Sequence, residues 1–243
     1  MWHKISNNYS PNFNPIKRRH NKIKYIVIHY TGMKSEIAAI KKLCDENQNV
    51  SSNYFIKKNG EIINLVPDLY EAWHAGKSRW NNHISLNKNS IGIEIHNPGH
   101  AHGYSNFSSK QIHSLKFLLK KLVRKYKIEI RNILGHSDIA PERKKDPGEK
   151  FPWKELSKSK LAKWHNLSEK KINRLRLIRL SQKDEKQFLK NLKTIGYCRI
   201  KNLKLETSNK FIIKAFQRRF RQKLINGISD LECFEISKNL IKH

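Results

Sequence analysis

A polar, proline-rich stretch from Gly135 to Trp153, GHSDIAPERKKDPGEKFPW, limits what this chain can fold into more than any other segment. Its three prolines lack a backbone N–H, so the stretch as a whole cannot be a regular helix or a central strand. We therefore expect a long, shaped loop after a short strand at 132–134. Long loops of this kind are uncommon in compact domains and usually carry function. His136 and Asp146 within it are side chains of the type that zinc accepts.

Three patterns before this loop predict β-structure. The β-branched and aromatic run at 24–31 is typical of a buried strand. The apolar runs at 52–56 and 61–66 flank an Asn-Gly pair, which predicts a hairpin. The alternating run at 90–97 predicts a strand in which Glu94 lies on the face opposite to three isoleucines. A carboxylate at the centre of such a strand is costly unless it is paired or functional.

Helical periodicity accompanies these strands. Ser35 can cap a helix that runs to about Glu46, with one apolar face formed by Ile37, Ile40, Leu43 and Cys44. The segment Ser108 to Gln111 fits a capping box and opens a second amphipathic helix. Strands and helices that alternate in this way predict an α/β fold, with a mixed central β-sheet flanked by helices over 23–157.

The remaining segments are predicted to differ from this domain. Residues 1–22 are polar and basic, and we expect them to form an arm outside the core. Beyond 157 only helical patterns occur, which predicts a linker at 158–167 and a small all-α domain at 168–243. The expected helices of that domain cover 170–180, 181–195, 208–223 and a last segment that begins at Asp230.

The chain carries a formal charge of +30, of which +14 precedes residue 158 and +16 lies in the shorter remainder. Such an excess favours an anionic partner, and compositional drift towards Lys, Asn and Ile explains it equally well. No nucleic-acid recognition motif is present, so we expect no nucleic-acid partner. No apolar run is long enough for a membrane span or a signal peptide. We expect a cytoplasmic protein, or a periplasmic one if a leader is missing.

Metal chemistry is indicated by two histidines and an aspartate rather than by cysteine, since the three cysteines are far apart and form no CxxC pair. His29, His136 and Asp146 would supply two imidazoles and one carboxylate. A catalytic zinc site uses three protein ligands and leaves a fourth position for water. Spacing alone leaves a structural role for each of these residues open.

Five motifs, in order, carry a family resemblance: VIHYT, SSNYFI, AWHAG, SIGIEIHN and GHSDIAPERKKDPGEKFPW. Over residues 23–157 the chain resembles the type 2 zinc-dependent N-acetylmuramoyl-L-alanine amidases, which include AmpD-like and AmiD-like bacterial enzymes and the peptidoglycan recognition proteins. The resemblance implies a zinc ion (Zn²⁺) bound by His29, His136 and Asp146. It also implies that Glu94 assists the attacking water and that Lys144 stabilises the oxyanion.

An extended loop would place Lys144 and Asp146 on the same side and Lys145 on the other. Further candidates, for contact with substrate, are His74, Trp73, Asn53 and Asn97. Many members of the family have a histidine in place of Asn53.

The resemblance predicts hydrolysis of the amide between N-acetylmuramic acid, including its 1,6-anhydro form, and L-alanine in peptidoglycan fragments. Such a bacterial enzyme would serve cell-wall turnover or recycling, and its partner would be peptidoglycan or a muropeptide. The alternative is a non-catalytic peptidoglycan-binding protein. The tail motifs AFQRRF and INGISD resemble the three-helix peptidoglycan-binding domain of type 1. We expect the basic charge of the tail to attract carboxylate-rich wall peptides.

Overall fold

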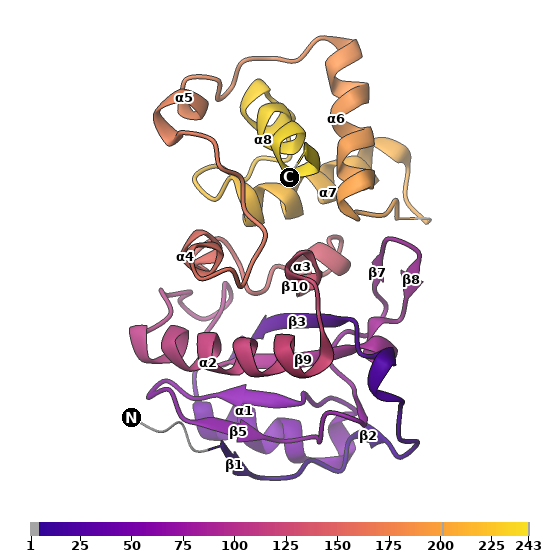
Figure 1. The fold of residues 1–243 in the computed structure, drawn as a ribbon, viewed down its shortest axis with the longest axis vertical. Helices are drawn as coiled ribbons and strands as arrows, with labels where there is room; N and C mark the ends of the chain where they lie inside the picture. The colour runs from indigo at the N-terminus through magenta and orange to yellow at the C-terminus, as the bar shows by residue number, and fades with distance from the viewer. Residues whose placement is uncertain (1–4, 201, 243) are drawn as a thin grey trace.

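A computed structural model describes residues 5–200 and 202–242 and has a six-stranded sheet at its centre (Figure 1). Its strands are β1 (Ile5–Asn7), β3 (Tyr25–Tyr30), β4 (Tyr54–Ile56), β5 (Ile62–Asn64), β9 (Ser90–Ile95) and β10 (Ile133–Gly135). They lie in the order β1-β5-β4-β9-β3-β10, and every neighbouring pair is parallel except the β4–β5 hairpin. Short ladders also join β2 (Phe13–Asn14) to β6 (Glu71–Ala72) and β7 (Arg79–Trp80) to β8 (His83–Ile84). The predicted mixed sheet is confirmed.

The helices of the described residues are α1 (Glu36–Cys44), α2 (Ser109–Tyr126), α3 (His136–Ile139), α4 (Trp153–Lys158), α5 (Glu169–Asn173), α6 (Gln182–Ile195), α7 (Leu205–Phe220) and α8 (Leu231–Lys242). Short 3-10 turns lie at His20–Lys22, Glu46–Gln48, Leu86–Asn89 and Ile130–Asn132. None of the helices in these residues is long and apolar enough to cross a membrane.

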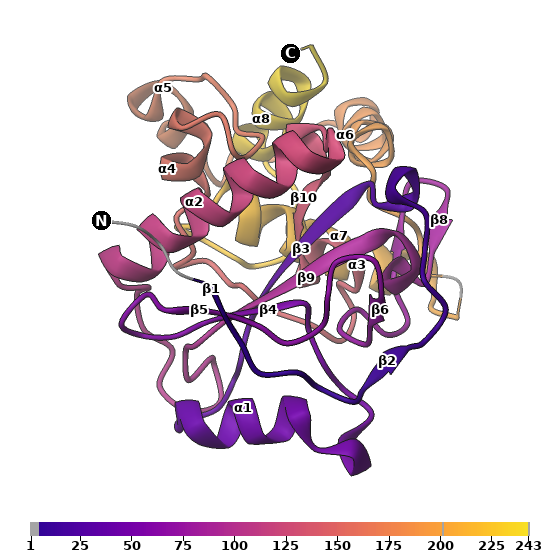
Figure 2. The ribbon, with the colours of Figure 1, turned by 60° about the horizontal axis from the view of Figure 1, so that its bottom comes forward.

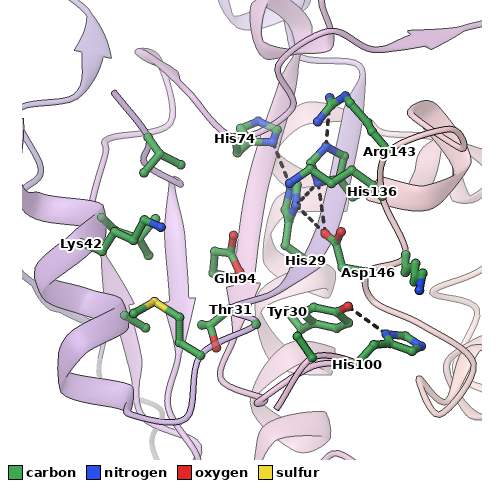
Figure 3. A pocket seen from close by; sticks show the side chains of 18 residues that line it. His29, Tyr30, Thr31, Lys42, His74, Glu94, His100, His136, Arg143 and Asp146 are labelled. Atoms are coloured by element: carbon green, nitrogen blue, oxygen red, sulfur yellow. Dashed lines mark hydrogen bonds and ion pairs between the residues drawn. The ribbon is translucent and has the colours of Figure 1, made fainter. Parts of the chain in front are cut away.

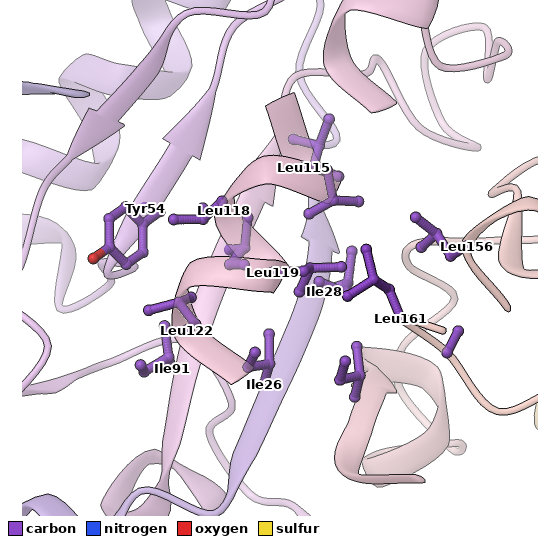
Figure 4. Close-up of a cluster of buried hydrophobic side chains, with 14 of the residues drawn as sticks. Ile26, Ile28, Tyr54, Ile91, Leu115, Leu118, Leu119, Leu122, Leu156 and Leu161 are labelled. Carbon is purple, nitrogen blue, oxygen red and sulfur yellow. The ribbon is translucent and has the colours of Figure 1, made fainter. Parts of the chain in front are cut away.

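Helix α2 covers one face of the sheet. Its buried leucines pack against isoleucines of β3 and β9, such as Ile26, Ile28 and Ile91 (Figure 4). The predicted capping box starts this helix, because the Ser108 hydroxyl accepts from the Gln111 amide and the Gln111 side chain accepts from the Ser108 amide. Alternation along β3 and β9 then sends the residues next to these isoleucines, including His29 and Glu94, to the opposite face.

Helix α1 covers part of that opposite face. Ala39 and Leu43 are buried there against Phe55 of β4. The cap is the predicted one, since the Ser35 hydroxyl accepts from the Ala38 amide. The predicted apolar face is wrong at Ile37, which is 80% exposed because packing through Ala39 and Leu43 turns it towards solvent.

The C-terminal helices cover the rest of the same face, at the β3–β10 side of the sheet (Figure 2). Val27 of β3 and Leu134 of β10 share one buried cluster with Phe188 of α6 and Phe216 of α7. The helical segment is therefore a second layer on the sheet, with its apolar contacts made directly to the strands.

Several predicted boundaries are corrected by the structure. Residues 5–14 are not an arm, since β1 is an edge strand and β2 pairs with β6; residues 1–4 lie outside the described part. The expected linker contributes Leu161 and Ala162 to the buried cluster beneath α2. The helix expected at 170–180 is limited to α5, because the chain beyond it turns through Leu177 at a positive φ.

Candidate active site

The site begins with one register pair of the central strands. His29 of β3 lies directly beside Glu94 of β9, and both side chains leave the sheet on the same face. They open into a cavity of about 520 Å³, bounded on one side by α1 and on the other by Arg143 to Asp146 of the proline-rich stretch (Figure 3). The C-terminal ends of β3 and β9 thus lie next to the proline-rich stretch.

Three ligand atoms meet at one corner of this cavity. His29 Nδ1 lies 2.9 Å from His136 Nδ1 and 3.0 Å from Asp146 Oδ2, and the remaining side of the triangle is 3.1 Å. All three residues are at most 5% exposed. The structure therefore brings together the three residues that the sequence predicts as ligands, across 117 positions of the chain.

The protons of both imidazoles lie outside this triangle. His136 Nε2 donates to the Ala75 carbonyl at 3.2 Å, which leaves Nδ1 with a free lone pair. His29 Nε2 lies 3.0 Å from His74 Nδ1, and His74 Nε2 lies 3.2 Å from the Ser90 hydroxyl.

The Ser90 hydroxyl fixes the direction of this chain of hydrogen bonds. Its single proton goes to the Leu86 carbonyl, so its oxygen accepts from His74 Nε2. His74 Nδ1 must then accept from His29 Nε2, and His29 Nδ1 also keeps its lone pair. Burial lowers the pKa of His29 to about 4, which keeps that imidazole neutral at pH 7.

Two imidazole lone pairs and a carboxylate oxygen thus converge without a proton between them, an arrangement that a cation satisfies. Tetrahedral zinc with bonds of about 2.0–2.1 Å holds its ligand atoms about 3.3 Å apart, close to the spacing found here. The mixed nitrogen and oxygen set is also one that zinc accepts. The three residues fit a zinc ion.

Glu94 is the unpaired polar group beside the triangle. Its Oε2 atom is buried and has no hydrogen-bond partner among the described residues. Burial, with a further contribution from the charge of Asp146, raises the pKa of Glu94 to about 8. A buried carboxyl group that has a raised pKa and faces a cavity is typical of an acid–base residue.

The lysines of the loop line the same cavity, but the segment is not extended. The Lys144 amide closes a turn onto the Ala140 carbonyl at 3.0 Å. Lys144 lies close enough to lower the pKa of both His29 and Glu94 by its charge. The expectation that Lys145 points away is wrong, since it also lines the cavity.

Of the four residues predicted to contact substrate, only His74 lines the cavity. His74 also positions His29 through the hydrogen bond described above. Trp73 is half-buried and does not line the cavity. The Asn53 amide is fully buried and bonds Val66, Tyr70 and Gly92, and the Asn97 amide bonds Ser105 and Gly99. Substrate contact at these four residues stays a prediction.

Two groups that the sequence did not single out also border the site. Arg143 donates to the carbonyls of Ala75 and Lys77, and its guanidinium lies 3.4 Å from His136 Nε2 because both share the Ala75 oxygen. Tyr30 and His100 line the cavity on the side of the loop, where the Tyr30 hydroxyl lies 2.9 Å from His100 Nδ1. The position of Arg143 directly before the predicted Lys144 is the one sequence signal for the first group.

Comparisons with known proteins identify the family of the chain. A family model described as N-acetylmuramoyl-L-alanine amidase matches residues 19–149. The N-acetylmuramoyl-L-alanine amidase AmiD of Escherichia coli is 34% identical over 235 residues, which cover 91% of this chain and 83% of AmiD. The 1,6-anhydro-N-acetylmuramyl-L-alanine amidase AmpD of Enterobacter cloacae is 38% identical over 104 residues, 43% of this chain and 54% of AmpD.

Solved structures show the same similarity over most of the chain. The complex of E. coli AmiD with anhydro-N-acetylmuramic acid-L-Ala-D-γ-Glu-L-Lys matches with a TM-score of 0.80 and 32% identity, covering 94% of this chain and 92% of that one. AmpDh3 from Pseudomonas aeruginosa matches with a TM-score of 0.78 and 29% identity, covering 94% of each chain. The protein is therefore an enzyme of the N-acetylmuramoyl-L-alanine amidase family.

Proposed function

We propose that this enzyme uses zinc to hydrolyse the amide between the lactyl group of N-acetylmuramic acid, including its 1,6-anhydro form, and L-alanine in peptidoglycan fragments. The observation that carries the proposal is the triangle of His29, His136 and Asp146 with the unpaired carboxyl of Glu94 beside it. The AmiD complex with an anhydro-muramyl tripeptide supports the choice of substrate.

His29, His136 and Asp146 would hold the zinc ion. Bound there, zinc would polarise the scissile carbonyl and acidify the attacking water. Glu94 takes the proton of that water and passes it to the departing amine of L-alanine. It is ionised, as a base must be, when positive charge in the triangle offsets its burial.

Lys144 supplies the positive charge for the oxygen of the tetrahedral intermediate. Its side chain lines the same cavity as the triangle, which supports this role. His74 and the Ala75 carbonyl act through the imidazoles, because they fix the tautomers that present both Nδ1 atoms.

The charge of the cavity suits an acidic peptide. Its cationic side chains are Lys42, Arg143, Lys144 and Lys145, against the two carboxylates Glu94 and Asp146. A γ-linked glutamate, such as the one in the AmiD ligand, has a free α-carboxylate close to the scissile bond. Lys42 of α1 reaches into the cavity from the wall opposite the triangle and is the cation that best fits such a carboxylate (Figure 3).

We also propose a division of labour along the chain. The segment 23–157 forms the catalytic domain, and 168–243 is a peptidoglycan-binding-like helical domain that helps to hold larger fragments. Turnover of short soluble fragments would then depend less on the helical surface than binding to sacculi does.

Mass spectrometry of the products tests the reaction. The enzyme is incubated with anhydro-muropeptides and with intact sacculi, with and without a chelator. We expect release of peptides that begin with L-alanine, loss of turnover with the chelator and recovery with added zinc. Binding without cleavage would establish the non-catalytic alternative, and turnover that resists the chelator would exclude zinc. The preferred substrate separates a role in recycling from one on the wall itself.

A further inference from the structure

Asp138 is a buried carboxylate in the loop that the proposed mechanism does not use. It lies in α3, two residues after His136, and is 1% exposed. Its Oδ2 accepts from the Gly135 amide at 2.8 Å and from Arg219 Nη1 at 2.6 Å, and its Oδ1 accepts from the Tyr197 hydroxyl at 2.7 Å. Two of these three donors come from the C-terminal helical segment.

Arg219 of α7 holds both ends of the loop at once. Besides Asp138, its guanidinium donates to the Ile133 carbonyl of β10 at 2.9 Å. Its plane lies over the ring of Trp153, 4.2 Å from the ring centre, where the loop ends and α4 begins. A single side chain, 2% exposed, therefore contacts the strand before His136, the turn after it and the end of the loop.

The turn that Asp138 holds is connected directly to two of the proposed metal ligands. His136 is the first residue of α3, and the Gly135 amide bonded to Asp138 immediately precedes it. The next amide, of Ser137, donates to the Asp146 carbonyl at 2.8 Å. Displacement of this turn would move His136 and Asp146 relative to His29, whose position is set by the sheet.

We propose that Asp138, Arg219 and Tyr197 are positioning residues that set the metal affinity of the catalytic domain from the helical segment. The proposal rests on the zinc site of the proposed function, but not on its amidase reaction. A buried ion pair contributes little net stability, since desolvation offsets its attraction, and it is more effective at fixing one geometry. The Nε atom of Arg219 is itself buried without a partner, which also favours a positioning role over a stabilising one.

The helical segment offers a matched control. Asp230 is likewise buried, at 2% exposure, and likewise has three partners: Arg221 Nη1 at 3.0 Å and the amides of Leu177 and Cys233. None of these partners belongs to the metal-binding loop. Asp138→Asn and Asp230→Asn therefore remove the same charge from similar environments, and only the first is connected to His136.

The test measures the zinc dissociation constant of the purified, full-length protein by competition with a chromogenic chelator, together with the Tm of the metal-free form. We expect Asp138→Asn to weaken zinc binding about 10-fold, the lower end of the effect of losing a direct outer partner of a metal ligand, because Asp138 acts on His136 through the Gly135 amide. Asp230→Asn should lower the Tm to a similar extent and leave the affinity within about twofold. Equal changes in both variants, or an unchanged affinity in Asp138→Asn, would overturn the proposal.

Tyr197→Phe keeps the test decisive if Asp138→Asn does not fold. It deletes one hydroxyl from the same carboxylate and should weaken zinc binding severalfold. An unchanged affinity in this variant would overturn the proposal. Wild-type protein that binds zinc but releases no peptide from muropeptides would refute the amidase reaction and leave this inference standing. Wild-type protein that binds no zinc would overturn both.

Discussion

Replacement of Glu94 by glutamine should make the metal-free protein more stable while it removes activity. The carboxyl is buried beside Asp146, and these surroundings raise its pKa from 4.5 to about 8. Glutamine has nearly the same shape and no charge to bury. The substitution therefore separates the energetic cost of the base from its catalytic benefit.

The size of this stability difference follows from the difference between the pKa of Glu94 in the folded and in the unfolded protein. Between pH 4.5 and 8 the unfolded chain has lost this proton and the folded metal-free protein keeps it. The folded state then binds more protons, so its stability falls as the pH rises through this window. At pH 7 the cost is at most about 3.4 kcal/mol, from about 2.5 pKa units at about 1.36 kcal/mol each. Glu94→Gln should recover up to that amount at pH 7 and almost none at about pH 4.

Urea unfolding of the metal-free proteins at several pH values measures this difference. Exposed Glu46→Gln is the control and should change the free energy of unfolding by less than about 0.5 kcal/mol. In the zinc-loaded enzyme, Glu94→Gln should lower kcat about 10²- to 10⁴-fold with zinc still bound. A stability difference that does not vary with pH would refute the burial argument, and an unchanged kcat would refute the role as base.

Three further predictions concern the metal, a buried histidine and the cavity wall. Zinc at 100 times its Kd should stabilise the wild type by about 2.7 kcal/mol and His136→Ala hardly at all, as seen in thermal unfolding; equal stabilisation would place the metal elsewhere. Burial lowers the pKa of His165 to about 4, so between pH 6.5 and 4 the unfolded state binds more protons and stability falls as the pH falls. His165→Gln should remove roughly 2–3 kcal/mol of this acid sensitivity, and an identical pH profile would contradict it. Lys42→Ala should raise KM severalfold for muropeptides with a free glutamate α-carboxylate and leave it unchanged for amidated ones; equal effects would exclude the proposed contact.

The sequence predicted those parts of the fold that depend on local pattern. The strands β3 and β9, the β4–β5 hairpin and the capped start of α2 all follow from residues close in the chain. Strand β1 was missed because three residues cannot show alternation, and it exists only through its pairing with β5. Helix α3 was missed for another reason. The prolines of the loop all follow it and so do not interrupt its single turn.

The site shows the same division between local and tertiary information. Motifs identified His29, His136 and Asp146 as a set, and the structure brings them together. The partners that fix the imidazole tautomers, such as Ser90 and the Ala75 carbonyl, carry no sequence signal, because they become neighbours only when strands and loops pack. A serine in a strand and a backbone oxygen acquire their roles entirely from tertiary structure.

Tertiary structure changes the expected role of the basic tail more than that of any other segment. The motif QRRFR would place three arginines on a surface that attracts wall carboxylates, yet Arg218, Arg219 and Arg221 are at most 8% exposed. Two of them are paired with buried aspartates, Asp138 and Asp230. The charges of Arg219 and Arg221 are neutralised by these aspartates within the fold. They therefore do not contribute to the electrostatic binding of an anionic polymer. Attraction of the helical segment to peptidoglycan must therefore come from its exposed lysines and from the exposed Arg174, Arg179 and Arg199. It should also fall with salt less steeply than the +16 charge of that segment implies.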